Sequence, residues 1–338
     1  MNLSKSSRME KIKKPVQLLL DTDMGNDIDD ALALAMIHAL QSRGECELIG
    51  VTVSKDNPYA AMYVDLINTF YSRGNIPIGC VANGATPEEG TYARQVVELA
   101  DDAGVPLFER TMGDPAEYPS AVAMTRRLLA ASDDEAVVVL MIGFSTNMAR
   151  LLESSPDEHS ELGGLELFKK KVSHVVMMAG EFAPDILADP MQKKAEFNVR
   201  LDVPSARAFI ARCPRPIWFS GLEVGKSVLY PAAALDADYG WCTYHPVVEA
   251  YKRYLPMPYD RPTWDLTAVL FAVRPGQGYF GVSEPGLVNV DENGYVRFRP
   301  HPDGLHRYLT VNDQQRVLVG EVQNELAAQP CEAETVLA

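Results

Sequence analysis

The sequence has few cysteines, few histidines, no long apolar run and no excess of positive charge. Its five cysteines are odd in number and widely spread, and none belongs to a Cys-x-x-Cys pair. That pattern disfavours a disulfide framework and a cysteine-ligated zinc site, and it is typical of reduced thiols. We therefore expect a cytoplasmic protein.

Positive charge is scarce, since 31 Lys and Arg residues against 46 Asp and Glu residues give a net charge of −15. A nucleic-acid-binding surface is basic, so this balance argues against nucleic acid as a partner. Basic residues are frequent in segment 1–15, but the apolar run after it covers only residues 16–20. A signal peptide needs about 7–15 apolar residues and a membrane span about 20. We expect a disordered basic tail over 1–15 and no membrane contact.

Short apolar runs alternate with amphipathic stretches through much of the chain. Apolar residues make up 47% and charged residues 23%, which is typical of a globular protein. Strands are expected at residues 16–21, 47–54, 76–80, 136–142, 172–178 and 217–220. Helix-like segments lie near residues 28–42, 58–73, 119–132, 146–154 and 203–212. This alternation predicts an α/β fold, a mostly parallel open sheet flanked by helices with a Rossmann-like core.

The chain length of 338 residues is large for one domain, but α/β folds often extend this far as a single unit. We expect one domain over residues 16–328 and a tail at 329–338. The stretch 225–263 is rich in aromatic residues and is predicted to be a small helical insertion that covers the site. The polar stretches 83–94 and 180–195 are expected to form pocket walls or lids.

The most informative segment is Asp21-Thr22-Asp23-Met24-Gly25-Asn26-Asp27-Ile28-Asp29-Asp30. It places five aspartates within ten residues, directly after a strand pattern and directly before a helix pattern. Carboxylates this close raise one another's pKa values unless a cation or strong donors lie among them. Ligand sets made only of oxygen favour Ca²⁺ or Mg²⁺ over zinc. The segment therefore predicts a hard-cation site.

Three other interpretations of this segment fit less well. A helix cap needs only one or two acids. An EF-hand loop has Gly at its sixth position and Glu at its twelfth, whereas counting from Asp21 gives Asn26 and Leu32. A phosphatase of the haloacid dehalogenase type usually continues with Gly-Thr, and here the continuation is Met24-Gly25-Asn26.

Three further segments join the aspartate cluster in one pattern. They are Gly143-Phe144-Ser145-Thr146-Asn147, then Ala195-Glu196-Phe197-Asn198-Val199 with Asp202, and finally Trp264-Asp265 ahead of an apolar helix. In order and spacing, the four segments resemble those of the nucleoside hydrolase family, the inosine-uridine-preferring ribohydrolases. The resemblance covers roughly residues 16–275 and implies a small-molecule nucleoside substrate. It also implies a homo-oligomer, either a dimer or a tetramer.

The resemblance further implies a Ca²⁺ ion held by Asp23, Asp30, Asp265 and the backbone carbonyl of Thr146. Asp23 would act as the general base on a water molecule whose pKa the cation lowers. That water would attack the anomeric carbon of the ribose and release the base from its N-glycosidic bond. Thr146 and Asp265 each precede or begin a helix-like segment, so a helix cap is the alternative role for both.

Ribose contacts are implied for Asp29, Asn57, Glu196 and Asn198. Glu196 and Asn198 are two apart on a segment expected to be extended, so they should face one side while Phe197 points into the core. A helix cap is the alternative for Asn57, and a surface strand pair is the alternative for Glu196 and Asn198.

Two departures from the family pattern affect the site. An extra pair, Asp27-Ile28, makes Asp27 the first alternative to Asp30 as a metal ligand. Trp264 occupies a position where the family usually has histidine, and tryptophan cannot protonate a leaving base. His245 is then a candidate for the acid that protonates the leaving base. Both His245 and Trp264 are expected in the substrate pocket. The rival pocket residues are Tyr244, Tyr254, Tyr259 and Arg261.

The substitution by Trp264 leaves two functions open. The first is metal-dependent hydrolysis of a ribonucleoside or related riboside. The alternative is a non-catalytic, calcium-dependent protein that binds ribose or nucleosides.

Overall fold

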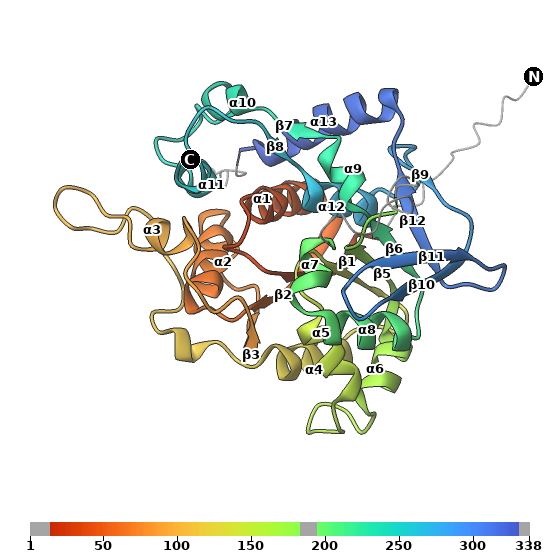
Figure 1. Ribbon diagram of the computed structural model, residues 1–338. Coiled ribbons are helices and arrows are strands. Elements are labelled where there is room, and N and C mark those ends of the chain that lie inside the picture. Colours follow the sequence, from red (N-terminus) through yellow and green to blue (C-terminus); the bar gives the residue numbers. More distant parts are fainter. Residues whose placement is uncertain (1–13, 183–194, 331–338) are drawn as a thin grey trace, which may run out of the picture.

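The computed structural model describes residues 14–182 and 195–330, and its centre is a ten-stranded sheet (Figure 1). Its strands follow the order β11-β10-β12-β6-β5-β4-β1-β2-β3, and β9 pairs with β12. Neighbouring strands from β3 to β12 in this order pair in parallel. Antiparallel pairs join β10 to β11, β10 to β12 and β9 to β12. The parallel strands are β1 (Val16–Thr22), β2 (Cys46–Lys55), β3 (Ile78–Ala85), β4 (Val137–Met141), β5 (Val172–Met178), β6 (Ile217–Ser220) and β12 (His306–Thr310).

The six strands expected from the apolar runs are all confirmed as β1 to β6, with shifts of a few residues at their ends. The antiparallel strands near the C-terminus were not expected. These are β9 (Gly281–Val282), β10 (Gly286–Val290) and β11 (Val296–Pro300). The α/β class with a mostly parallel sheet is thereby confirmed.

The first strand shows why these segments form a buried sheet. Leu18 and Leu20 pack into the hydrophobic core on one face, and Leu19 packs into the core on the other. All three side chains are fully buried. A parallel strand covered on both faces is apolar at consecutive positions, which is the pattern that predicted it.

Helices cover both faces of the sheet (Figure 1). On one face lie α1 (Asp29–Ser42), α2 (Pro58–Phe70) and α12 (Trp264–Val273). Two further helices, α11 (Pro246–Tyr254) and α13 (Asp313–Ala327), pack on α1. The other face is covered by α4 (Ala121–Ala131), α5 (Thr146–Glu153), α6 (Gly164–Lys171) and α8 (Val203–Arg212). Shorter helices are α3 (Ala93–Val97), η1 (Pro115–Glu117), α7 (Phe197–Leu201), α9 (Leu222–Lys226) and α10 (Ala232–Ala237).

The aromatic stretch 225–263 contains α10, α11 and a two-stranded sheet of β7 (Leu229–Tyr230) and β8 (Arg261–Pro262). The expected tails lie almost wholly outside the described residues, as does most of the expected pocket wall 180–195. Within the described ranges, no helix is long and apolar enough to cross a bilayer. The four cysteines found there, Cys46, Cys80, Cys213 and Cys242, are free thiols.

The strand order places β1 between β2 and β4. After β1 the chain continues to β2 on one side, and after β4 it continues to β5 on the other side. A crevice therefore forms between the C-terminal ends of β1 and β4. Ligands of open α/β sheets bind in such a crevice. This is where the aspartate segment lies.

Candidate active site

A cavity of about 330 Å³ opens beside the C-terminal ends of β1, β4 and β5. Its lining includes Ile142 and Met178 from the ends of β4 and β5. The acidic residues in the lining are Asp23, Asp27, Asp29, Asp30, Glu196 and Asp265. Segments far apart in the sequence thus bring their carboxylates to one place.

Two glycines let the loop after β1 take its shape. Gly25 has φ +101°, in the left-handed region that favours glycine, and its N–H donates to the Tyr92 hydroxyl at 3.0 Å. Gly143, just after β4, lies so close to the loop that an added Cβ would be 2.4 Å from the backbone nitrogen of Asp23. The close approach at Gly143 brings Asp23 against the end of β4.

Three aspartates form a compact buried cluster. Asp29, Asp30 and Asp265 each bring one carboxylate oxygen within 4.8 Å of the others. They lie in the first turns of α1 and α12, where the helix dipole favours negative charge. Burial raises the pKa of all three carboxyls well above the ordinary value, and repulsion from neighbouring aspartates raises it further.

Asp23 lies at the same cavity and is 3% exposed. Its Oδ2 accepts a hydrogen bond of 2.7 Å from Nδ2 of Asn26. The Lys55 ammonium in turn donates to Oδ1 of Asn26 at 2.8 Å, which fixes the orientation of that amide. Burial raises the pKa of Asp23 to about 6, although the Asn26 hydrogen bond opposes the rise.

The support from Asn26 and Lys55 was not expected from the sequence. Lys55 ends β2 and is 3% exposed, and it also donates to the carbonyl oxygen of Thr86 at 2.8 Å. Burial lowers the pKa of its ammonium. A lysine at the end of a strand that faces an acidic loop is the signal that could have identified it.

Asp27 makes a different contact from the other loop aspartates. Its Oδ1 accepts from Nε of Arg261 at 2.9 Å, and its Oδ2 pairs with Nη2 of the same guanidinium. The structure therefore places Asp27 against β8, and it places Asp30 with Asp29 and Asp265. The insertion Asp27-Ile28 supplies a partner for Arg261.

Glu196 and Asn198 both reach the cavity, although the segment is not extended. Glu196 caps α7, where its carboxylate accepts from the backbone N–H groups of Asn198 at 2.7 Å and Val199 at 3.1 Å. Asn198 donates through Nδ2 to the carbonyl oxygens of Ile142 and Met178. The prediction that Phe197 points into the core is wrong, since it is 41% exposed and lines the cavity. Helical backbone does not alternate its side chains between two faces.

Burial raises the pKa of Glu196 to about 7, although its backbone hydrogen bonds oppose the rise. Asp21, at the end of β1, shows the same effect: burial raises its pKa to about 7 against hydrogen bonds from Thr52 and Asn147. Asp21 therefore ties β1 to β2 and α5.

Two expected site residues have side chains engaged away from the cavity lining. Thr146 begins α5 and donates its hydroxyl hydrogen to Asp202. Asn57 caps α2, because its Oδ1 accepts from the N–H of Tyr59 at 3.0 Å, and its Nδ2 donates to the carbonyl of Pro87 at 3.1 Å.

His245 is not brought to the cavity either. It caps α11 within an aromatic cluster, and its Nε2 lies 3.1 Å from the Tyr71 hydroxyl. Burial lowers the pKa of its imidazole to about 3, so the ring is neutral near pH 7. Of the aromatic and basic candidates, the lining includes Tyr254, Arg261 and Trp264 but neither Tyr244 nor Tyr259.

The acid cluster fits a hard divalent cation. Within residues 14–182 and 195–330, no lysine or arginine forms an ion pair with Asp23, Asp29, Asp30 or Asp265. Buried carboxylates without a direct ion-pair partner are costly, and their all-oxygen donor set suits Ca²⁺ or Mg²⁺. A bound cation would balance this charge.

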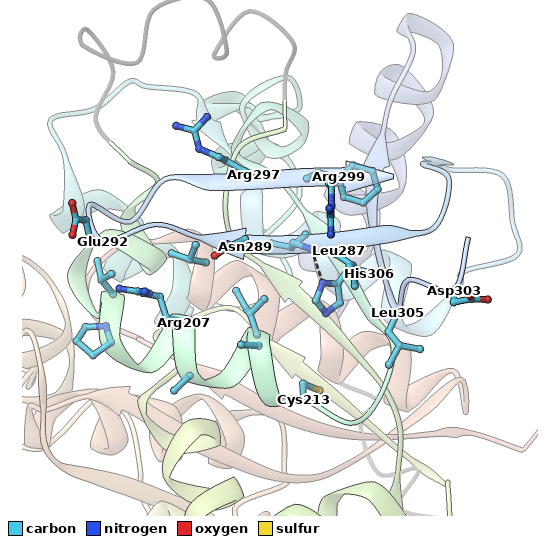
Figure 2. Close-up of a pocket in the computed structure, with 18 residues that line it drawn as sticks. Arg207, Cys213, Leu287, Asn289, Glu292, Arg297, Arg299, Asp303, Leu305 and His306 are labelled. Atoms are coloured by element: carbon cyan, nitrogen blue, oxygen red, sulfur yellow. Dashed lines mark hydrogen bonds between the residues drawn. The ribbon is translucent and has the colours of Figure 1, made fainter. Parts of the chain in front are cut away.

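A larger hollow of about 1560 Å³ lies between α8 and the β10–β11 hairpin (Figure 2). Its two acids, Glu292 and Asp303, lie at opposite ends in this view, and Arg207, Arg297 and Arg299 lie along it. No cluster of catalytic or metal-ligating side chains gathers there among the described residues. The smaller acidic cavity is therefore the candidate site.

The fold and the site define the class of protein. It is an α/β protein with helices on both faces of its sheet and a carboxylate-lined cavity beside the C-terminal ends of β1, β4 and β5. The sequence model described as "Inosine-uridine preferring nucleoside hydrolase" matches residues 18–332. The chain belongs to this family, which confirms the expected resemblance.

Known relatives agree with the family assignment. The pyrimidine-specific ribonucleoside hydrolase RihA of Klebsiella pneumoniae strain 342 is 29% identical over 219 residues. That match covers 64% of this chain and 63% of the relative, so the chain spans somewhat under two thirds of it.

Solved structures show a similar fold. The plant nucleoside hydrolase PpNRh1 superposes with a TM-score of 0.67 at 19% identity, covering 94% of this chain and 100% of that one. A purine-preferring ribonucleoside hydrolase from Gardnerella vaginalis gives 0.67 at 18% identity, covering 92% and 99% of the two chains.

Proposed function

We propose that this protein hydrolyses the N-glycosidic bond of a ribonucleoside or related riboside in a Ca²⁺-dependent reaction, giving ribose and a free base. The observation that carries the proposal is the buried set Asp23, Asp29, Asp30 and Asp265 at one cavity with aromatic side chains. Carboxylates suit both a cation and sugar hydroxyls, and aromatic rings suit a flat base. Family membership supports the same chemistry.

The cation would be held by Asp23, Asp30, Asp265 and the backbone carbonyl of Thr146. We propose Ca²⁺ because it accepts six to eight oxygen ligands in flexible geometry, including backbone carbonyls and waters. When bound, it would supply the positive charge that lowers the pKa of a water molecule and stabilises charge around the sugar.

Asp23 is proposed as the general base. Its Oδ2 accepts a hydrogen bond from Asn26, and its Oδ1 is the oxygen that we propose takes the proton. The water molecule would attack the anomeric carbon on the face opposite the base, which inverts the configuration. An oxocarbenium-like transition state carries positive charge that the surrounding carboxylates stabilise.

The sugar would be oriented by Asp29, Glu196 and Asn198. Both amide hydrogens of Asn198 are used by backbone carbonyls, so its Oδ1 is the atom left to accept from a ribose hydroxyl. Glu196 is held by backbone N–H groups in a fixed position. Asn57 and His245 would contribute only after their present hydrogen bonds were broken.

The relatives do not agree on a base, since one is named pyrimidine-specific and another purine-preferring. They support the ribonucleoside class without selecting a member of it. A cytoplasmic location and a homo-oligomeric state remain part of the proposal, the first resting on free thiols and the second on the family.

Ribose release from a nucleoside panel tests the proposal. Purified protein with Ca²⁺ is incubated with uridine, cytidine, inosine and adenosine, and reducing sugar is measured with and without a strong chelator. We expect release from at least one nucleoside and its loss in chelator. Full activity in chelator would refute the metal dependence, and saturable binding without any product would favour the non-catalytic alternative.

The increase in Tm on adding Ca²⁺ is expected to grow between pH 6 and pH 8. Burial raises the pKa of Asp23 to about 6 and raises the pKa values of Asp29, Asp30 and Asp265 well above the ordinary value, so some of these carboxyls still carry protons at the lower end of this range. Protons compete with the cation there, and the competition fades as pH rises through the folded-state pKa values.

Scanning calorimetry with excess Ca²⁺ or chelator at each pH measures this difference. Without the cation, the raised pKa values make stability fall as pH rises from the unfolded-state pKa of about 4 up to the folded-state values. The buried histidines titrate alike in both samples, so their contributions to stability cancel in the difference between the two Tm values. An equal Ca²⁺ effect at pH 6 and pH 8 would show that these carboxyls do not hold the ion.

A further inference from the structure

One arginine lies among the aromatic side chains that line the cavity. Phe197, Tyr254 and Trp264 line it, and Arg261 is the only lysine or arginine among its described lining residues. If a riboside binds as proposed, its hydroxyl-rich sugar suits the carboxylates and its flat base suits the aromatic surface. The base would therefore lie beside Arg261.

Arg261 is held firmly on two sides. Asp27 accepts from its Nε and Nη2, and the Tyr254 hydroxyl accepts from Nη2 at 3.1 Å. The guanidinium carbon lies 5.0 Å from the ring centroid of Tyr254 and 5.1 Å from that of Trp264. These contacts use Nε and Nη2 and leave the two N–H groups of Nη1 without a partner among the described residues.

The other side-chain N–H donors of the described lining are already used. Nε1 of Trp264 donates to the carbonyl oxygen of Leu222 at 3.0 Å. Nδ2 of Asn26 donates to Asp23 and Thr86, and Nδ2 of Asn198 donates to two backbone carbonyls. Nη1 of Arg261 is thus the side-chain nitrogen that can still donate to a ligand.

Cleavage of an N-glycosidic bond leaves the bonding electron pair on the base. Without an acid to protonate the base, the negative charge must be stabilised as it develops. Histidine is absent from the described lining, and Trp264 offers no acidic proton. We propose that Arg261, positioned by Asp27, stabilises the leaving base by donating hydrogen bonds from Nη1 to an oxygen of that base.

The atoms and charges of this step balance. The water oxygen bonds to C1′, and one water proton passes to Asp23. The C1′–N pair stays on the base, where it delocalises onto ring carbonyl oxygens that accept from Arg261. The base anion then takes a proton from solvent and Asp23 returns its proton to solvent, so one nucleoside and one water give ribose and neutral base. The inference rests on the proposed hydrolysis and names the residue that assists departure.

Two substrates with different leaving groups distinguish this role of Arg261 from a structural one. The uracil of uridine leaves as an anion with oxygen acceptors and needs stabilisation, whereas the nitrophenolate of 4-nitrophenyl β-D-ribofuranoside departs unaided. Removing one preorganised donor to a developing anion costs about 10²–10³-fold in rate. We expect Arg261→Met to lower kcat/KM for uridine about 100-fold, mostly in kcat, and that for the nitrophenyl riboside less than about threefold.

Two further variants strengthen the test. Asp27→Asn, which keeps Arg261 but loosens it, is expected to lower the uridine rate about tenfold and leave the nitrophenyl rate nearly unchanged. Arg297→Met is the matched control, because Arg297 lies on β11 at the other hollow and is 57% exposed. It should change neither rate. A retained Ca²⁺-induced rise in Tm shows that each variant is folded.

The outcomes are distinct. Equal losses on both substrates, or no loss on uridine, would overturn the role of Arg261 while leaving the hydrolase proposal intact. Failure of the wild type to release ribose from every nucleoside of the panel and from the nitrophenyl riboside would overturn the proposed function and this inference together. If Arg261→Met does not fold, Asp27→Asn carries the same comparison.

Discussion

Replacing Asp23 by asparagine is expected to lower kcat by about 10³-fold, within the 10²–10⁴-fold range of general-base catalysis. Asparagine keeps the shape and one oxygen ligand but cannot accept a proton from water. KM should change little, because the sugar contacts proposed for Asp29, Glu196 and Asn198 are retained. Steady-state ribose release from the best nucleoside of the panel measures both constants.

The matched control is Asp303→Asn, which removes an exposed acid at the hollow between α8 and the β10–β11 hairpin. Its rates should equal those of the wild type. A loss below about tenfold in Asp23→Asn, with Ca²⁺ still bound, would transfer the base role to another carboxylate. Glu196, whose pKa is raised to about 7 by burial, would be the next candidate.

Replacing Asp265 by asparagine is expected to change stability in opposite directions with and without Ca²⁺. Without the cation, the neutral amide removes a buried carboxylate that lies near Asp29 and Asp30, so Tm should rise. A gain of about 1–2 kcal/mol corresponds to a rise of a few °C. With saturating Ca²⁺ the order should reverse, because the variant loses a ligand and most of its cation-linked stability.

Calorimetry of both proteins in chelator and in Ca²⁺ measures this reversal, and ribose release should fall at least about 100-fold in the variant. Asp303→Asn again serves as control and should follow the wild type in both conditions. If Asp265→Asn were less stable than the wild type even in chelator, the carboxylate would be a structural acid with partners of its own.

Much of the fold is predictable from the sequence because buried parallel strands are apolar at consecutive positions. Leu18, Leu19 and Leu20 illustrate this, since both faces of β1 are covered. The antiparallel strands are less visible. In β11, exposed Arg297 and Arg299 alternate with half-buried residues at the edge of the sheet, so the strand carries little apolar signal.

The acidic half of the site is also predictable, because Asp21 to Asp30 are contiguous and follow a strand. Residues that meet only in the folded chain are harder to identify. Asp27 and Arg261 are 234 positions apart, and the sequence around either residue does not indicate that the two form an ion pair. The bond from Lys55 to Asn26 likewise needs the β1–β2 register before it can be inferred.

Phe197 shows a different limit. The expected alternation of Glu196, Phe197 and Asn198 assumes an extended segment, but the Glu196 carboxylate accepts from two following N–H groups and starts a helix there. A capping acid and an extended ligand segment look alike in sequence. The structure decides between them.

The most direct test of the central claim is a ¹H NMR time course of nucleoside cleavage by the wild-type protein in phosphate-free buffer with Ca²⁺. We expect free base and α-ribofuranose, the inverted anomer, to appear first and chelator to abolish both. Initial formation of the β anomer, cleavage only after phosphate is added, or no cleavage of any nucleoside would contradict the proposed hydrolysis.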